Sequence, residues 1–468
     1  MAVMDSFGLH LFIIISLYNA LVCNAIVPSS PSMDSWECSC AATASNTNPV
    51  RAGYWPWDAN SYMPTWNINA SLYTHLFYAF VDLDNQTFTV TVPQEQQQIF
   101  EGFSATVQEV NSSVKTLISI GGGSSNATLF SIMASNSSLR KSFIDSSIAL
   151  ARDNGFHGLD LDWEFPATRT DMDNFGYLLD EWRDKVHLEA LTSGLEPLLL
   201  TAAVYFSEHF FDGESRDYPI QIIADNLDWI NVMCFDYHGS WDTSHTGAHS
   251  ALYDVTSHLS TNYGIGSWLD SGIPPNKVVM GIPMYGRSWM LKNKEKVRIG
   301  SPAVAAGPRQ RLSNQTGFMM FSEVDHFIRK HNATVVIDNF TVSAYCYAGD
   351  VWISYDDKET VDLKTKFAKD RGLLGYFFWA VSYDHNWTLS TQASDAWDRY
   401  CIHEQKSHSF ISPVAAPSYS PSLSPSTGWQ DGSSNIGAMV GSARSIIYTF
   451  SSLSTSYLLP IAIILLLG

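Results

Sequence analysis

His157-Gly-Leu-Asp-Leu-Asp-Trp-Glu-Phe-Pro166 is the stretch of this chain that decides how it folds. Its acidic residues, Asp160, Asp162 and Glu164, recur at every second position among Leu, Trp and Phe. In a β-strand, this spacing directs all three carboxyl groups to one face. Adjacent carboxyl groups repel one another and resist desolvation, so the pKa of at least one of them should be raised. A general acid that works near neutral pH needs such a pKa. The stretch therefore predicts a strand that carries an acid–base site.

Eight short apolar runs, including this one, punctuate residues 50–385. Near-continuous apolar runs are typical of parallel strands that are buried on both faces. The segments between them can hold helices, for example Leu139–Arg152 and Met172–Ala190. Eight such units predict an α/β fold, a (β/α)8 TIM barrel, with a doubly wound open sheet as the alternative. The runs are Ala52–Trp55, His75–Val81, Thr116–Gly122, Gly158–Glu164, Leu198–Val204, Leu227–Asp236, Val278–Arg287 and Leu373–Asp384.

The barrel should span residues 50–400 and carry a small α+β insertion domain after its seventh strand. The gap between the seventh and eighth runs is too long for one helix, and residues 288–350 are patterned as short strands and turns. In a barrel of this kind, residues at the C-terminal ends of strands face the active site. Glu164 lies where the fourth strand ends, and Asp162 and Asp160 lie progressively deeper.

The two ends of the chain indicate export. Residues 1–25 are predicted to be a signal peptide, because Leu11–Leu17 are apolar and Cys23-Asn24-Ala25 is a suitable cleavage site. A membrane anchor is the alternative, but the apolar run is too short to span a bilayer. Residues 26–49 form a lead-in to the barrel. Nine glycosylation sequons support a secreted glycoprotein. Their asparagines are Asn69, Asn85, Asn111, Asn126, Asn136, Asn314, Asn332, Asn339 and Asn386.

The C-terminal region predicts attachment to a surface. Residues 401–430 are a Pro/Ser-rich linker. Residues 431–468 have the order of a GPI-anchor signal: small residues, a spacer and the apolar segment Tyr457–Leu467. A single-pass helix that starts at Ile446 is the competing interpretation. We expect an extracellular protein that is tethered to the outer plasma membrane or the cell wall.

The cysteines suit an oxidising compartment. Cys234 lies in an apolar run and should be a free, buried thiol. The other four cysteines of the mature chain could form two disulfides, with the pairing left open. We expect no metal and no cofactor, because no His or Cys pair repeats the Cys38/Cys40 spacing. A hard metal at the acidic strand would need oxygen ligands from several elements. The four cysteines are Cys38, Cys40, Cys346 and Cys401.

Charge and composition restrict the class of ligand. The formal net charge of −19 disfavours nucleic acid and other polyanions. Aromatic residues make up 13% of the chain, which suits a groove that stacks on sugar rings. We therefore expect a neutral or cationic ligand. We also expect the protein to be a monomer.

The acidic strand resembles the Asp-x-x-Asp-x-Asp-x-Glu signature of family 18 glycoside hydrolases, and of plant class V chitinases in particular. The resemblance covers about Val50 to Tyr400, and four further motifs follow in the family's order. They are Ser119-Ile-Gly-Gly122, Met233-Cys-Phe-Asp236, Gly281-Ile-Pro-Met-Tyr-Gly-Arg287 and Gly375-Tyr-Phe-Phe-Trp379.

This resemblance implies roles for the acids. Glu164 would be the general acid/base, and Asp162 would orient the acetamido group of the sugar. Asp160 would hold the shared charge one layer below, and Asp236 would join from the sixth strand. The family uses the substrate's own N-acetyl carbonyl as the nucleophile, so it needs no second catalytic carboxylate of the usual kind.

The resemblance also implies a substrate groove. Trp379 would form the floor under the reacting sugar, with a place in the barrel core as the alternative for Trp379 and Phe80. The predicted groove residues are Tyr54, Phe80, Trp163, Met233, Phe235, Tyr285, Arg287 and Trp379.

Two positions depart from the family pattern. His157 replaces the first Asp, at the deepest point of the strand, where its effect should be indirect. Phe235 stands where the family has a Tyr whose hydroxyl bonds the acetamido carbonyl. Loss of one such donor costs on the order of 10²–10³ in rate. Tyr237 is a possible substitute, although strand alternation points it away from Asp236.

Two functions follow from these patterns. The leading one is a chitinase that hydrolyses β-1,4-linked N-acetylglucosamine polymers or oligomers with retention of configuration. The alternative is a catalytically weak or inactive lectin-like relative that binds chitin, and Phe235 motivates it.

Overall fold

The computed structural model describes residues 48–400 with the exception of residue 212. The predicted signal peptide, the linker, the anchor signal and most of the lead-in lie outside these residues.

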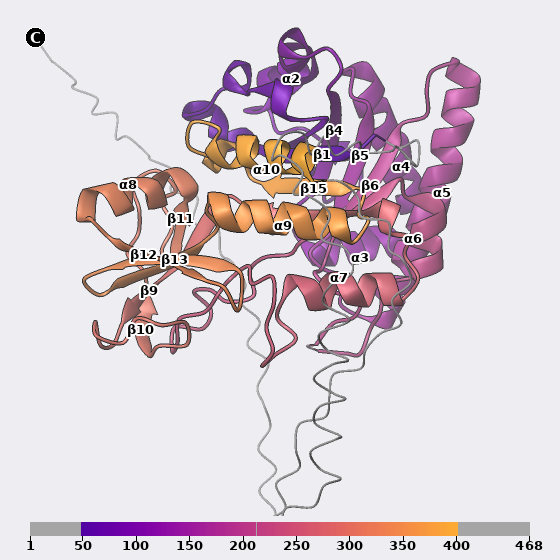
Figure 1. Cartoon of the computed structure of the whole chain (residues 1–468). Helices are drawn as coiled ribbons and strands as arrows, with labels where there is room; N and C mark the ends of the chain where they lie inside the picture. The colour runs from indigo at the N-terminus through magenta and orange to yellow at the C-terminus, as the bar shows by residue number, and fades with distance from the viewer. Residues whose placement is uncertain (1–47, 212, 401–468) are drawn as a thin grey trace, which may run out of the picture. The chain divides into compact units, whose positions relative to one another are not determined.

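Eight parallel strands form a closed barrel (Figure 1). Each strand pairs with the next in chain order, and β1 pairs with both β2 and β15, which closes the sheet. Each of the eight predicted runs overlaps one of these strands, so the predicted fold class is confirmed. A short strand, β3 (Val90–Thr91), extends β2 as an antiparallel partner. The barrel strands are β1 (Val50–Pro56), β2 (His75–Leu83), β4 (Lys115–Gly121), β5 (Gly158–Asp162), β6 (Leu199–Val204), β7 (Trp229–Val232), β8 (Val278–Pro283) and β15 (Gly375–Trp379).

Helices surround the barrel between successive strands (Figure 1). The two helices expected from sequence are α4 and α5. Helix α5 begins with a capping box, in which Thr168 accepts from the Asp171 backbone, and it ends at Gly194 with a φ of 73°. The helices are α2 (Gln97–Val110), α3 (Ala127–Ser135), α4 (Ser137–Asp153), α5 (Arg169–Ser193), α6 (Ile220–Asn226), α7 (Thr261–Asp270), α9 (Lys358–Asp370) and α10 (Thr388–Arg399). Short 3-10 helices cover Trp57–Ser61, Thr65–Asn67, Ala70–Leu72, Pro275–Lys277 and Val381–Tyr383.

Alternation along each strand divides the core into two parts. On β5, Leu159 and Leu161 belong to the large apolar cluster that the strands share with the helices. A separate cluster includes Tyr54 and Phe377 and packs beside Asp160 inside the barrel. The inward positions of β5 are therefore acidic, as the spacing predicts.

The insertion lies between β8 and α9 and has its own sheet, drawn on the left of Figure 1. Its strand order is β10-β9-β14-β13-β12, and β11 also pairs with β9. The α+β prediction is confirmed, but the seventh predicted run is two strands rather than one. The chain leaves the barrel at Pro283 and enters β9, so Tyr285 and Arg287 belong to the insertion sheet. The elements are β9 (Tyr285–Leu291), β10 (Ala303–Ala306), β11 (Phe318–Met320), α8 (Phe321–His331), β12 (Thr334–Asp338), β13 (Ser343–Ala348) and β14 (Val351–Tyr355).

Cys234 is a free, buried thiol, as predicted. Cys346 is also free and buried, and its predicted disulfide partners, Cys38, Cys40 and Cys401, lie outside the described residues. Within residues 48–400, residue 212 aside, no helix combines the length and the apolar character needed to cross a membrane.

Candidate active site

A cavity of about 620 Å³ opens at the C-terminal ends of the barrel strands. This volume lies in the range of small-molecule sites. Strand ends and the insertion both contribute to its walls, and it brings together ten of the predicted site residues. They are Tyr54, Phe80, Asp162, Glu164, Met233, Phe235, Asp236, Tyr285, Arg287 and Trp379.

The acids of the fourth barrel strand descend from the cavity into the barrel. Glu164 lies two residues beyond the end of β5, lines the cavity and is partly exposed. Asp162 also lines the cavity and is 4% exposed. Asp160 is fully buried beneath the cavity and does not line it. This order matches the depth that strand alternation predicts.

Asp160 is held by four hydrogen bonds. Its Oδ2 accepts from Tyr54 Oη at 2.9 Å and from Ser119 Oγ at 2.7 Å. Its Oδ1 accepts from Thr201 Oγ1 at 2.6 Å and from Asn231 Nδ2 at 3.3 Å. Burial raises the pKa of Asp160, and these four donors partly offset the effect because they favour the charged form. Asp160 therefore has no capacity left to reach a ligand, and its role is to anchor the layer below Asp162.

Asp162 is the acid that the protein leaves incompletely paired. Its Oδ1 is buried and has no hydrogen-bond partner among the described residues. Burial raises the pKa of Asp162 well above its ordinary value, and the charges of Glu164 and Asp160 raise it further. A buried oxygen without a hydrogen-bond partner lowers the stability of the fold. Because Asp162 lies in the cavity wall, a hydrogen-bond donor on a bound ligand could pair with its Oδ1.

Glu164 has the properties of a general acid. Burial raises the pKa of its carboxyl to about 7, and the charge of Asp236 adds to the increase. The loop after β4 leaves room beside it, since a Cβ on Gly123 would lie 3.2 Å from Glu164 Oε1. At neutral pH, Glu164 can therefore both donate and accept a proton.

Asp236 is a fixed anion in the cavity wall. Arg287 donates two hydrogen bonds to its carboxylate, from Nε to Oδ1 at 2.8 Å and from Nη2 to Oδ2 at 2.6 Å. Burial tends to raise the pKa of Asp236, but the Arg287 charge outweighs burial and holds that pKa well below its usual range. Asp236 adopts a left-handed backbone with a φ of 62°, unusual for a residue other than glycine. Nδ1 of the fully buried His249 lies 3.7 Å from its Oδ1.

Aromatic rings make up much of the cavity wall. Trp379 stacks on Phe80 with centroids 5.4 Å apart, and it meets Tyr54 edge-on at 5.7 Å. Trp379 and Phe80 both line the cavity and are partly exposed, so they are not simply barrel core. The Arg287 guanidinium lies 5.2 Å from the ring centre of Trp241, which is also part of the wall.

One predicted groove residue is misplaced. Trp163 is 2% exposed and packs against Phe130 and Phe175, at ring distances of 6.1 and 6.3 Å, on the helical side of the barrel. It is absent from the cavity wall. The prediction was wrong because Trp163 lies between two inward-facing acids, and alternation turns it outward.

The two departures from the family pattern have different surroundings. His157 Nδ1 accepts a hydrogen bond from the Thr116 backbone at 3.1 Å, next to the start of β5 and away from the cavity. Phe235 lines the cavity, with its ring 6.1 Å from that of Tyr285. The Tyr237 hydroxyl shares a buried hydrogen bond of 3.1 Å with Thr261 Oγ1, so it does not take the place of the missing hydroxyl.

The cavity also contains residues outside the predicted site. Tyr205 directly follows the fifth predicted strand, so the strand-end rule could have found it. Trp241 follows the sixth strand by several residues. Gln315 and Phe318 come from the insertion, and no local pattern marks them. The additional lining residues are Gly123, Ser124, Phe165, Ala203, Tyr205, Phe206, Tyr237, Trp241, Leu259, Gln315, Phe318, Phe377 and Tyr383.

Comparisons with known proteins agree with this arrangement. Residues 50–384 match the model of the glycosyl hydrolases family 18. A class V chitinase from Arabidopsis thaliana is 45% identical over 363 residues, which cover 77% of this chain and 92% of that protein. A solved structure of a class V chitinase mutant from Nicotiana tobaccum in complex with NAG4 is 45% identical, with a TM-score of 0.72 and coverage of 75% and 99%. The chitinase-like agglutinin RobpsCRA from Robinia pseudoacacia is 40% identical, with a TM-score of 0.68 and coverage of 74% and 99%.

Proposed function

The chain belongs to the glycosyl hydrolases family 18 and is a glycoside hydrolase, and we propose that its substrate is chitin or its N-acetylglucosamine oligomers. The observation that carries this proposal is the pair formed by Glu164 and Asp162. Glu164 has a pKa of about 7, and Asp162 presents an unpaired buried oxygen beside it. The pair lies in an aromatic cavity that suits a neutral sugar.

In the first step, protonated Glu164 donates its proton to the glycosidic oxygen as the bond from that oxygen to the anomeric carbon breaks. The acetamido carbonyl oxygen of the same sugar attacks the anomeric carbon and forms a cyclic, positively charged intermediate. The sugar that leaves takes the proton. Glu164 is now a carboxylate, and it removes a proton from the water molecule that attacks the anomeric carbon and opens the cyclic intermediate. The configuration at the anomeric carbon is retained because it is inverted twice.

Asp162 orients the nucleophile in this scheme. Its free Oδ1 accepts the acetamido N–H, which turns the carbonyl oxygen toward the anomeric carbon. Asp160 supports it from below with a carboxylate that four donors hold in place. Burial keeps the pKa of Glu164 high, and the charge of Asp236 adds to this effect because a second charge nearby disfavours ionisation.

Phe235 limits the rate of this reaction. The ring borders the cavity but offers no hydroxyl for the acetamido carbonyl. The loss of one such donor lowers the rate on the order of 10²–10³. A second candidate function, binding without turnover, is favoured by this residue and by the similarity to an agglutinin. Glu164 and Asp162 support the enzyme over the lectin.

Hydrolysis of N-acetylglucosamine oligomers by the purified protein tests the proposal. We expect Glu164→Gln to abolish turnover while oligomer binding persists, because glutamine keeps the shape and loses the proton. The matched control is Glu101→Gln, which changes an exposed glutamate on α2. Turnover that survives Glu164→Gln would overturn the proposed mechanism. Oligomer binding without turnover in the wild type would favour the lectin.

We also propose that the protein is a secreted, glycosylated monomer with a disulfide bond, anchored by a GPI group. All nine sequon asparagines belong to the described residues, and seven of them are exposed, which is what glycosylation requires. Treatment with a glycosidase that removes N-linked glycans should lower the apparent mass of the protein. Treatment of intact cells with a phospholipase that cleaves GPI anchors should release it.

A further inference from the structure

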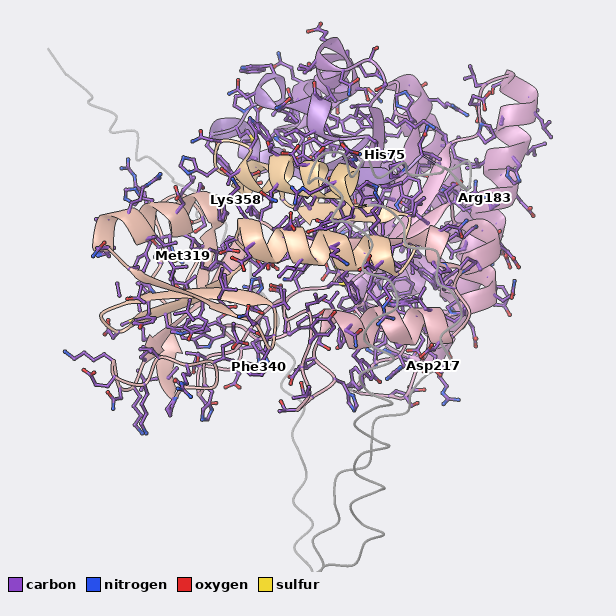
Figure 2. All side chains as sticks on the ribbon, in the orientation of Figure 1. His75, Arg183, Asp217, Met319, Phe340 and Lys358 are labelled. Atoms are coloured by element: carbon purple, nitrogen blue, oxygen red, sulfur yellow. The ribbon has the colours of Figure 1, made fainter. Side chains whose placement is uncertain are left out.

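A second cavity, of about 390 Å³, lies between the neighbouring helices α4 and α5 and shares no residue with the active-site cavity. Figure 2 labels Arg183 on α5, the helix at the right-hand edge of the molecule. We call this second cavity the α4–α5 groove. Ile144, which is 3% exposed, gives it an apolar floor. Its volume is in the range of small-ligand sites. Its lining includes Ser138, Lys141, Ile144 and Asp145 of α4 and Glu181 and Lys185 of α5.

The charges in the walls of the groove balance one another. Asp145 pairs with Lys141 of its own helix, and its Oδ1 lies 3.0 Å from Lys185 Nζ of α5. Glu181 pairs with Arg140, whose Nη2 lies 2.6 Å from Glu181 Oε1. Each carboxylate in the walls therefore already has a cationic partner. Polar walls of this kind suit a neutral ligand that carries hydroxyl groups better than they suit an ion.

The groove begins at a glycosylation sequon. Asn136, Ser137 and Ser138 form the sequon, and both serines line the groove. Asn136 is exposed and caps α4, because its Oδ1 accepts from the backbone N–H of Ser138 at 2.8 Å and of Leu139 at 3.3 Å. No described residue accepts a hydrogen bond from its Nδ2, the atom to which an N-linked glycan is attached. The cap and a glycan can therefore exist together.

A second capping sequon differs from this one only in its surroundings. Asn126 is also exposed and caps α3, where its Oδ1 accepts from the Thr128 backbone at 3.1 Å. No residue of its sequon lines the α4–α5 groove or the active-site cavity. Asn126 therefore provides a matched comparison for Asn136.

We propose that Asn136 carries an N-linked glycan whose first N-acetylglucosamine lies in the α4–α5 groove and joins α4 to α5. This inference rests on the proposal that the protein is secreted and glycosylated. In the attachment, Nδ2 forms a bond to the anomeric carbon of that sugar, and the bond from this carbon to a lipid-linked diphosphate breaks. The amide loses one proton. The sugar reaches the groove without a spacer, because it is bonded directly to Asn136 beside the two serines. Its hydroxyl groups accept from Lys141 and Lys185 and donate to Glu181.

Thermal unfolding tests this inference on the full-length protein, purified from cells that attach N-linked glycans. Mass spectrometry of its peptides should show a glycan at Asn136. Asn136→Asp removes the glycan and keeps the cap, because aspartate caps helices as well as asparagine does. We expect Asn136→Asp to lower the Tm by about 1–3 °C, as the loss of one or two hydrogen bonds implies. The matched control, Asn126→Asp, removes a glycan and keeps a cap in the same way, and it should not lower the Tm.

Two further measurements show whether the groove holds the sugar. Trimming by an endoglycosidase that leaves only the first N-acetylglucosamine should preserve the difference in Tm between the wild type and Asn136→Asp. Lys141→Ala should lower the Tm more in the glycosylated protein than in Asn136→Asp, because only the former has a sugar for the lysine to contact. Hydrolysis of oligomers should be the same in all these variants, since their positions lie outside the active-site cavity.

The outcomes separate this inference from the proposal of export. An unmodified Asn136 in a protein that is glycosylated at other sequons would overturn the inference and leave export intact. A protein without any N-linked glycan would overturn both. Equal effects of Asn136→Asp and Asn126→Asp, or of Lys141→Ala in the two backgrounds, would show that the groove does not hold the sugar. Should Asn136→Asp fail to fold, Ser138→Ala removes the same sequon and leaves the cap, with Ser138→Thr as the control that keeps the sequon.

Discussion

Arg287 holds Asp236 through both of its carboxylate oxygens, and this pair links the insertion to the barrel at the active site. The two bonds are 2.8 and 2.6 Å long, and they join β9 of the insertion to the segment after β7. Two parallel bonds of this kind fix the carboxylate in orientation as well as in charge. The Asp236 charge adds to the effect of burial in raising the pKa of Glu164. The insertion, which holds Asp236 through Arg287, therefore influences the pKa of the proton donor without touching it.

The pH dependence of wild-type turnover should report Glu164. The reaction needs Glu164 protonated, and its pKa of about 7 means that the protonated fraction falls as pH rises through neutrality. We therefore expect kcat/KM to decline about tenfold per pH unit well above pH 7. Initial rates on an oligomer across pH 5 to 9 provide the measurement. A profile that stays flat to pH 9 would show that another group donates the proton.

Asp236→Asn should move the basic limb of the pH profile, the decline of kcat/KM at high pH, to lower pH. The substitution removes the anion that raises the pKa of Glu164 and keeps the shape of the side chain. Burial still raises that pKa, so the limb should stop short of the ordinary glutamate value. The control is Asp325→Asn, which changes a carboxylate on α8 outside the cavity wall. An unshifted limb in Asp236→Asn would mean that the two carboxyl groups are not coupled.

Phe235→Tyr should increase turnover. The ring already borders the cavity, and a hydroxyl on it would give the acetamido carbonyl the donor that it lacks. We expect a gain in kcat on the order of 10². Phe318→Tyr is the matched control, because it adds a hydroxyl to another ring of the wall and should give no such gain. Equal turnover in Phe235→Tyr and wild type would show that this position does not limit the enzyme.

Lys364→Met should destabilise the fold. Lys364 of α9 donates to Asp356 at 2.6 Å and to the Ser250 carbonyl at 2.5 Å, and both ends of the ion pair are buried. Removal of the lysine leaves a buried carboxylate without its counter-ion, which costs about 3–5 kcal/mol. The double variant Lys364→Met/Asp356→Leu should recover much of the loss. Thermal unfolding measures both, and a single variant as stable as the wild type would contradict this account.

The part of the site that can be predicted from the sequence is the part that strand alternation determines. It places Asp160 and Asp162 inside the barrel and Glu164 above them, because a period of two needs no knowledge of tertiary structure. The same rule places Trp163 on the opposite side, where it packs against the helices instead of lining the groove. Tyr205 was also within reach of the rule that strand ends face the site.

The insertion explains why the remainder could not be predicted. Phe318 reaches the cavity because β11 pairs with β9, and that pairing joins segments with no periodic pattern in common. Gln315 lies in the segment that leads into β11. The chain likewise leaves the barrel at Pro283, which takes Tyr285 and Arg287 out of the seventh barrel strand that their motif predicts. The surroundings of Tyr237 depend on Thr261, which is distant in sequence. Contacts of this kind are set by tertiary packing rather than by local pattern.

The anomeric configuration of the first product tests the central claim most directly. Proton NMR spectra recorded while the wild-type protein hydrolyses an N-acetylglucosamine oligomer distinguish the two anomers before they interconvert. Attack by the acetamido group followed by water predicts that the β-anomer appears first. Initial formation of the α-anomer, or no product at all, would contradict the assignment of Glu164 and Asp162 to substrate-assisted hydrolysis.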